Sequence, residues 1–128
     1  MKPTTIRTRY AVKFGIINML SSTQGWAFQS SLSLLEMKGC LDAGSGREWI
    51  VGDSHFHGDY LGCRIEEATV VRIYTTEPSN YVVNLRYRSL SDDAAMANVR
   101  IERSESTLLE QFLPLIKAAN VLPAEPIE

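Results

Sequence analysis

Apolar and polar residues alternate along several stretches of the chain, which is the pattern of strands that bury one face. Residues 6–16 alternate in this way, and their β-branched and aromatic side chains favour a strand over the helix that the same positions also allow. Two better strands are expected at residues 65–76 and 81–89, on either side of a turn-forming Glu-Pro-Ser-Asn segment, so we predict a β-hairpin there. In its second strand the apolar odd-numbered positions, from Tyr81 to Tyr87, should face the core.

Two further short strands are expected, at residues 48–51 and at residues 98–103, where Val99 alternates with charged neighbours. Residues 42–46 and 89–95 are rich in Gly, Ser and Asp, which is the composition of surface loops. Each of these two strands therefore has a loop-like segment before it.

Two other stretches have the spacing of helices. Residues 23–38 place apolar side chains at helical intervals and should end near Gly39, although Trp26 and Phe28 also alternate as in a strand. A second helix should begin near Ser104 and carry one apolar stripe, made of Leu108, Leu109, Phe112, Leu115, Ile116 and Ala119. Pro114 should kink or shorten this helix, and the last eight residues are expected to fray.

These elements predict an α+β fold, with a mostly antiparallel sheet of four to five strands and an N-terminal and a C-terminal helix packed on one face. The 128 residues fit a single domain, and no linker or internal repeat divides them. With 45% hydrophobic and 22% charged residues, the composition is neither that of a disordered chain nor that of a membrane protein.

Charge and cysteine content narrow the function classes. A formal net charge of −2 gives no general attraction to nucleic acid or to acidic membranes. No apolar run approaches the roughly 18 residues of a membrane span. Two cysteines, Cys40 and Cys63, are too few for a disulfide scaffold, so we expect free thiols and a cytoplasmic protein.

Both histidines of the chain stand one residue apart, between Asp53 and Asp59. If this segment is extended, all four side chains project from one face. Imidazole nitrogens and carboxylate oxygens bind zinc and manganese, so His55, His57 and Asp59 are candidate metal ligands. The alternative is turn chemistry, in which glycines on either side of the histidines supply unusual backbone angles.

The run from Ser54 to Gly62 resembles the His-x-His-x-Asp-His motif of the metallo-β-lactamase fold. That resemblance implies a metal-binding turn, but Tyr60 stands where the family has its last histidine, and further ligand histidines are missing downstream. We therefore retain the local chemistry without assigning the family. A further metal ligand would come from Cys40, Cys63, Glu66 or Glu67.

Two other constellations could bind ligands. Trp26, Phe28 and Trp49 could line an apolar pocket between helix and sheet, although such residues more often fill a core. Basic and aromatic residues also fall on adjacent strands at 72–74 and 86–88, as on sheets that bind RNA. Because Tyr87 and its neighbouring arginines should point to opposite faces, and the chain is acidic, nucleic-acid binding is the less favoured hypothesis.

The sequence thus predicts a small cytoplasmic binding or protein-interaction domain without catalytic activity or cofactor, which holds a small apolar ligand or a protein partner and does not enter a membrane. One alternative is a small metal-dependent or acid/base enzyme centred on His55 and His57, with zinc or manganese. Another is an RNA-binding sheet. We also expect a homodimer that covers an edge strand, sought among residues 81–88 and 98–103, or the face that carries Val82 and Asn84.

Overall fold

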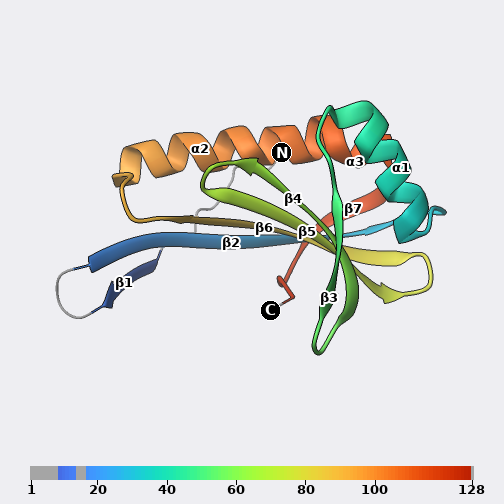
Figure 1. Cartoon of the computed structure of the whole chain (residues 1–128), viewed down its shortest axis with the longest axis horizontal. Helices are drawn as coiled ribbons and strands as arrows, with labels where there is room; N and C mark the ends of the chain where they lie inside the picture. Colours follow the sequence, from blue (N-terminus) through green and yellow to red (C-terminus); the bar gives the residue numbers. More distant parts are fainter. Residues whose placement is uncertain (1–8, 14–16, 128) are drawn as a thin grey trace.

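Seven antiparallel strands and two main helices make up the fold in a computed structural model that describes residues 9–13 and 17–127 (Figure 1). The strands are β1 (Arg9–Lys13), β2 (Ile17–Gln29), β3 (Ile50–Ser54), β4 (Gly58–Glu66), β5 (Thr69–Glu77), β6 (Asn80–Ser89) and β7 (Ala119–Ala124). They form one sheet in the order β1-β2-β6-β5-β4-β3, and β7 pairs with β2. The α+β class with an antiparallel sheet is confirmed, whereas the expected four to five strands are too few.

The N-terminal helix lies further along the chain than predicted. Residues up to Gln29 belong to β2, which pairs with β6 from Leu20 to Gln29 and buries Trp26 and Phe28 by strand alternation. Helix α1 (Leu34–Ser45) begins at Ser33, whose hydroxyl accepts a hydrogen bond from the Glu36 N–H while the Glu36 side chain bonds back to the Ser33 N–H. The predicted helix over residues 23–38 and the predicted loop over residues 42–46 are therefore wrong in position.

The β5–β6 hairpin is confirmed, with Pro78 and Ser79 in the turn and Ser79 at a φ of 68°. Its register follows the alternation in the sequence: four side chains of β6 point into the core and are at most 4% exposed, namely Tyr81, Val83, Leu85 and Tyr87. Strand β6 lies between β2 and β5, so it is not the edge strand that we expected.

The strand predicted at residues 98–103 is instead part of helix α2 (Ala94–Ser106). Asp93 caps this helix, because its carboxylate accepts a hydrogen bond of 2.8 Å from the Met96 N–H. The buried positions of α2 are Ala97, Ile101, Ser104 and Glu105. The mixture of a Ser and a Glu with apolar residues hides this helical stripe from a hydrophobicity pattern.

The second helix is longer than predicted and the chain after it is ordered into a strand. From α2 the helix continues as a π-helical segment (Thr107–Phe112) and a short turn α3 (Leu113–Leu115), and it ends one residue after Pro114. Strand β7 then pairs with β2, which corrects the expectation of a frayed tail. Its Pro123 is tolerated because β7 lies at an edge of the sheet.

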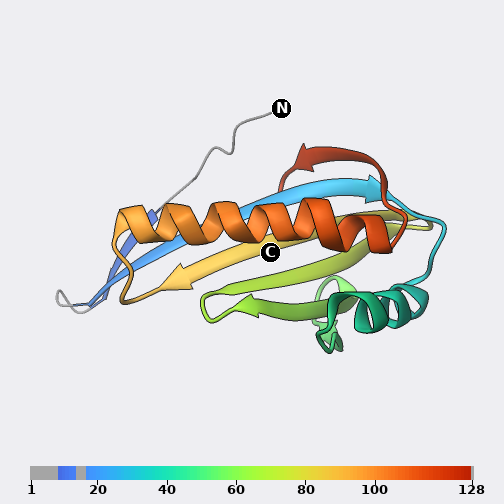
Figure 2. The same ribbon diagram turned by 90° about the horizontal axis from the view of Figure 1, so that it is seen from above.

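Helices α1 and α2 lie above the sheet in the view of Figure 1, and the chain passes below the sheet after β7. Seen from above in Figure 2, α2 runs along the sheet beside β6, while α1 lies nearer β4. In the largest core cluster, Met37 and Leu41 of α1 and Leu108 and Phe112 of the π-helical segment pack together with the sheet side chains that face the helices. No helix among the described residues is long and apolar enough to cross a membrane.

A basic pocket on the helix-free face of the sheet

The lower face of the sheet in Figure 1, which we call the helix-free face, carries the side chains that alternate with the core residues of β4, β5 and β6. Val71, Val83 and Leu85 point into the core, so their neighbours on each strand point to the helix-free face. Strand pairing places Arg72 opposite Asn84, Val70 opposite Arg86, and Tyr74 opposite Val82. Two arginines from adjacent strands therefore lie on one face of the sheet.

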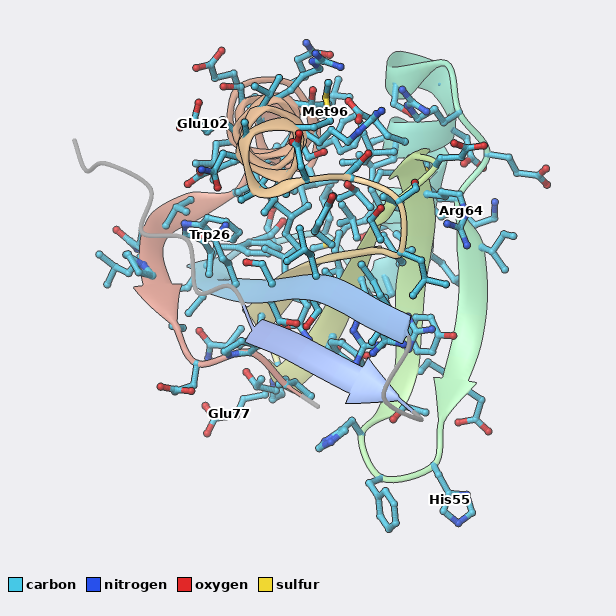
Figure 3. All side chains as sticks on the ribbon, turned by 90° about the vertical axis from the view of Figure 1, so that its left-hand side faces the viewer. Trp26, His55, Arg64, Glu77, Met96 and Glu102 are labelled. Carbon is cyan, nitrogen blue, oxygen red and sulfur yellow. The ribbon has the colours of Figure 1, made fainter. Side chains whose placement is uncertain are left out.

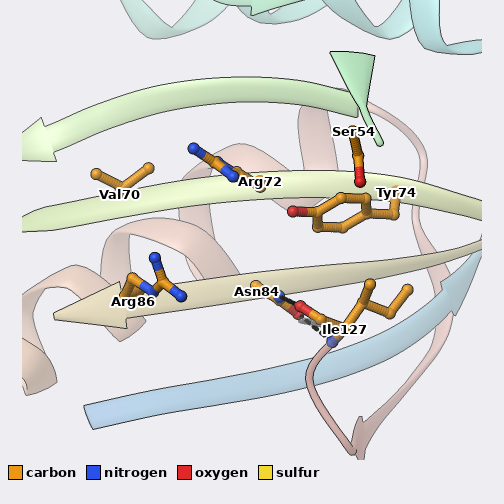
Figure 4. Close-up of a pocket in the computed structure, with 7 residues that line it drawn as sticks. All are labelled: Ser54, Val70, Arg72, Tyr74, Asn84, Arg86 and Ile127. Carbon is orange, nitrogen blue, oxygen red and sulfur yellow. Dashed lines mark hydrogen bonds between the residues drawn. The ribbon is translucent and has the colours of Figure 1, made fainter. Parts of the chain in front are cut away.

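A cavity of about 220 Å³ opens on this face (Figure 4). We call it the basic pocket; its described lining residues are Ser54, Val70, Arg72, Tyr74, Asn84, Arg86 and Ile127. Two of them are arginines and none is acidic, whereas hydroxyl and amide groups come from Ser54, Tyr74 and Asn84. The lining thus combines positive charge with neutral hydrogen-bonding groups.

Aromatic rings beside the basic pocket orient Arg72. The guanidinium carbon of Arg72 lies 4.4 Å from the centre of the Tyr60 ring, which is the geometry of a cation–π contact. Tyr60 lies 5.5 Å from Tyr74, and the His57 ring meets Tyr74 edge to face at 6.0 Å. The three rings therefore form a row beside the pocket, and the Tyr60 ring restricts how the guanidinium of Arg72 can move.

The chain itself contributes one wall from below the sheet. The backbone N–H of Ile127 donates a hydrogen bond of 3.0 Å to the Asn84 side-chain oxygen, and the Asn84 amide donates in turn to the Ile127 carbonyl. Both bonds are drawn in Figure 4. Asn84 is only 6% exposed, and its amide group both donates to and accepts from the backbone of residue 127.

The apolar residues that we singled out for a ligand lie in the core between the sheet and the helices. Trp26, Phe28 and Trp49 are each at most 5% exposed and belong to the main core cluster. Trp49 packs edge to face on Phe112 with ring centres 5.2 Å apart, and its indole N–H donates to Ser45. A ligand that contacts these residues would have to displace parts of the core, so the apolar-pocket hypothesis stays a prediction.

The two histidines lie at the tip of the β3–β4 hairpin, which projects from the body of the sheet (Figure 3). Residues 55–57 form a turn closed by a hydrogen bond from the His57 N–H to the Ser54 hydroxyl, and Gly58 has a φ of 76°. The segment is therefore not extended, and the four side chains do not share a strand face.

The part of the chain that the structure describes brings no further metal ligand into a group with the histidines at this tip. Among the described residues, no three His, Cys, Asp or Glu side chains form a group that could hold a metal ion. Glu66 instead pairs with Arg100 and Arg103 of α2, at 3.5 and 3.4 Å. Binding of zinc or manganese by His55, His57 and Asp59 stays a prediction.

Cys63 offers little nucleophilic chemistry. Burial raises the pKa of the Cys63 thiol, so the thiolate that attacks an electrophile is disfavoured there. The Cys63 sulfur lies 3.6 Å from the Arg64 carbonyl oxygen, and both cysteines are free.

Sequence reasoning finds part of the basic pocket and misses the rest. The RNA-binding hypothesis singles out Arg72, Tyr74 and Arg86, and the structure places all three in the pocket lining. It misses Asn84 and Ile127, because the partnership between them requires a chain end that folds back under the sheet.

No protein-family model matches the chain, and no curated protein matches its sequence significantly.

Proposed function

We propose that the chain is a binding domain whose ligand presents a carboxylate or phosphate group to the basic pocket. The observation that carries this proposal is the pair Arg72 and Arg86, which come from adjacent strands of the helix-free face and line the same cavity. Hydrogen bonds from arginine to such anions are charge-assisted and stronger than neutral ones. Ser54 and Tyr74 would add neutral donors.

The size of the cavity limits the ligand group. Pockets for whole small molecules typically measure about 300–1,000 Å³. The basic pocket, at about 220 Å³, is smaller and suits a single anionic group or side chain. We therefore expect the pocket to receive one charged end of a ligand, whereas the rest lies along the sheet.

Binding rather than catalysis follows from the chemistry of the lining. Its described members are Ser, Val, Arg, Tyr, Asn and Ile, and none of these side chains has an ordinary pKa near neutral pH. General acid–base catalysis works best with a group that titrates close to the working pH. The lining instead offers fixed positive charge and hydrogen-bond donors, which serve recognition.

Titration with inorganic phosphate and with glutarate tests the proposal, followed by NMR shifts of the arginine side chains. One charge-assisted hydrogen bond contributes about 1.5–3 kcal/mol. Arg72→Gln and Arg86→Gln should therefore each weaken binding by roughly ten- to hundredfold. Arg88→Gln is the matched control, because Arg88 is exposed on the same strand as Arg86 and lies outside the pocket lining.

Equal losses in all three variants would contradict a localised pocket. Such a result, together with tight and strongly salt-dependent binding of a single-stranded RNA decamer, would favour the RNA-binding alternative. Absence of any saturable binding of phosphate and glutarate would reject the proposed function.

A further inference from the structure

Residues 125–127 run below the sheet, and the Asn84 side chain binds this segment through the backbone of Ile127. Asn84 accepts from the Ile127 N–H and donates to the Ile127 carbonyl. These two bonds would form with any residue except proline at that position, because they involve no side chain of the bound segment. Asn84 therefore acts as a clamp for an extended backbone.

The backbone of residues 124–126 lies very close to strand β2 at Gly25. A Cβ atom at Gly25 would lie 2.8 Å from the Ala124 carbonyl oxygen and 2.9 Å from the Pro126 Cα. Distances this short are repulsive, so only glycine lets the segment lie against β2 at this point. Gly25 and Asn84 are partners in the β2–β6 register. Together they form the surface on which residues 125–127 lie, which we call the peptide seat.

The peptide seat adjoins the basic pocket. Asn84 and Ile127 belong to the pocket lining together with Arg72 and Arg86. A chain segment held by the Asn84 clamp therefore brings its neighbouring side chains within reach of two guanidinium groups, which favour carboxylates.

We infer that the ligand of the helix-free face is an acidic peptide in extended conformation, whose backbone is held by Asn84 over Gly25 and whose carboxylate side chain enters the basic pocket. The inference rests on the proposed anion-binding function and names its ligand class. Residues 125–127 occupy the peptide seat in the structure, so they compete with an incoming peptide. The affinity measured for a peptide is reduced by the fraction of molecules in which this segment stays bound.

Fluorescence anisotropy with a labelled peptide of residues 122–128, Leu-Pro-Ala-Glu-Pro-Ile-Glu, tests the inference on the full chain. The variant Ile127→Pro lacks the N–H that donates to Asn84, which should release the competing segment. We expect this variant to bind the peptide roughly tenfold more tightly than the wild type. A control peptide with both Glu replaced by Gln should bind at least roughly tenfold more weakly than the acidic one.

Two further variants separate the clamp from the anion site. Gly25→Ala combined with Ile127→Pro should lose peptide binding but keep phosphate binding at the arginines, because Gly25 lies outside the pocket lining. Asn84→Ala in the same background should also lose peptide binding. Peptide binding that is absent in Ile127→Pro, or indifferent to Asn84→Ala and to the Gln peptide, overturns the inference if phosphate still binds. If neither peptide nor phosphate binds, both the inference and the proposed function are wrong.

Discussion

Thr69, the first residue of β5, has a side chain that is fully buried, and its hydroxyl has no hydrogen-bond partner among the described residues. A buried hydroxyl without a partner has lost its bonds to water, which costs about 1–3 kcal/mol. Valine has nearly the same shape and the same preference for strands. We predict that Thr69→Val raises the free energy of unfolding by about 1 kcal/mol, measured by urea denaturation.

The matched control for this change lies on the same strand. Thr75 is exposed, so Thr75→Val should alter the free energy of unfolding by no more than about 0.5 kcal/mol. A loss of stability in Thr69→Val would contradict the prediction, because it would mean that the Thr69 hydroxyl is bonded to an internal water.

At the scale of elements, the hydroxyl of Tyr87 helps to hold α2 against the end of β6. The Tyr87 hydroxyl donates a hydrogen bond of 2.6 Å to Asp92, which also pairs with Arg100 of α2 at 2.9 Å. Burial, and then the hydrogen bond to Asp92, raise the pKa of Tyr87 from 10.0 to about 12. The neutral phenol is therefore favoured by folding.

This shift predicts how stability depends on alkaline pH. Because the pKa of Tyr87 is higher in the folded than in the unfolded state, its contribution is complete below about pH 10 and is lost as the pH rises through about 12. Urea midpoints between pH 9 and 12 should fall less steeply in Tyr87→Phe than in the wild type. Equal slopes in the two proteins would contradict the assignment.

The same scale shows which elements the sequence can reveal. The β5–β6 hairpin is predictable because two segments rich in β-branched and aromatic residues flank a turn that contains Pro78. The sequence of helix α2 favours a strand because Val99 and Ile101 alternate with charges, whereas its buried face includes the polar residues Ser104 and Glu105. A polar residue on a buried helix face removes the periodic signal on which the prediction depends.

For the whole molecule, the order of the strands decides where a second copy could pair. Val82 and Asn84 are already buried within one chain, and β6 is internal, so neither serves the dimer as we expected. Strand β3 ends the sheet and exposes Ile50 and Val51. An edge with exposed apolar residues favours pairing with another chain.

We therefore predict a homodimer formed through β3, with a mass in light scattering of twice the 14.3 kDa of one chain. Val51→Lys should return the protein to the mass of one chain, because an edge lysine opposes pairing. Thr75→Lys, on the internal strand β5, is the control and should remain dimeric. A wild-type mass of one chain that stays constant over a tenfold change of concentration would reject the dimer.

The candidate site is predictable only in part, for a reason that also lies at this scale. The arginines and tyrosines of β4, β5 and β6 are local features of strands, and the sequence points to several of them. The clamp at Asn84 depends on residues 125–127, which are 43 positions away for the Asn84–Ile127 pair. A contact of that separation leaves no periodic trace in the chain.

The pairing of β2 has a consequence for how the chain is made. One edge of β2 pairs with β6, whereas the other is shared by β1 and, from Gly25 to Gln29, by β7. During translation this stretch of β2 must wait for nearly a hundred further residues before its partner leaves the ribosome. Until then its backbone groups are open to any extended chain nearby, so the nascent protein needs protection at that edge.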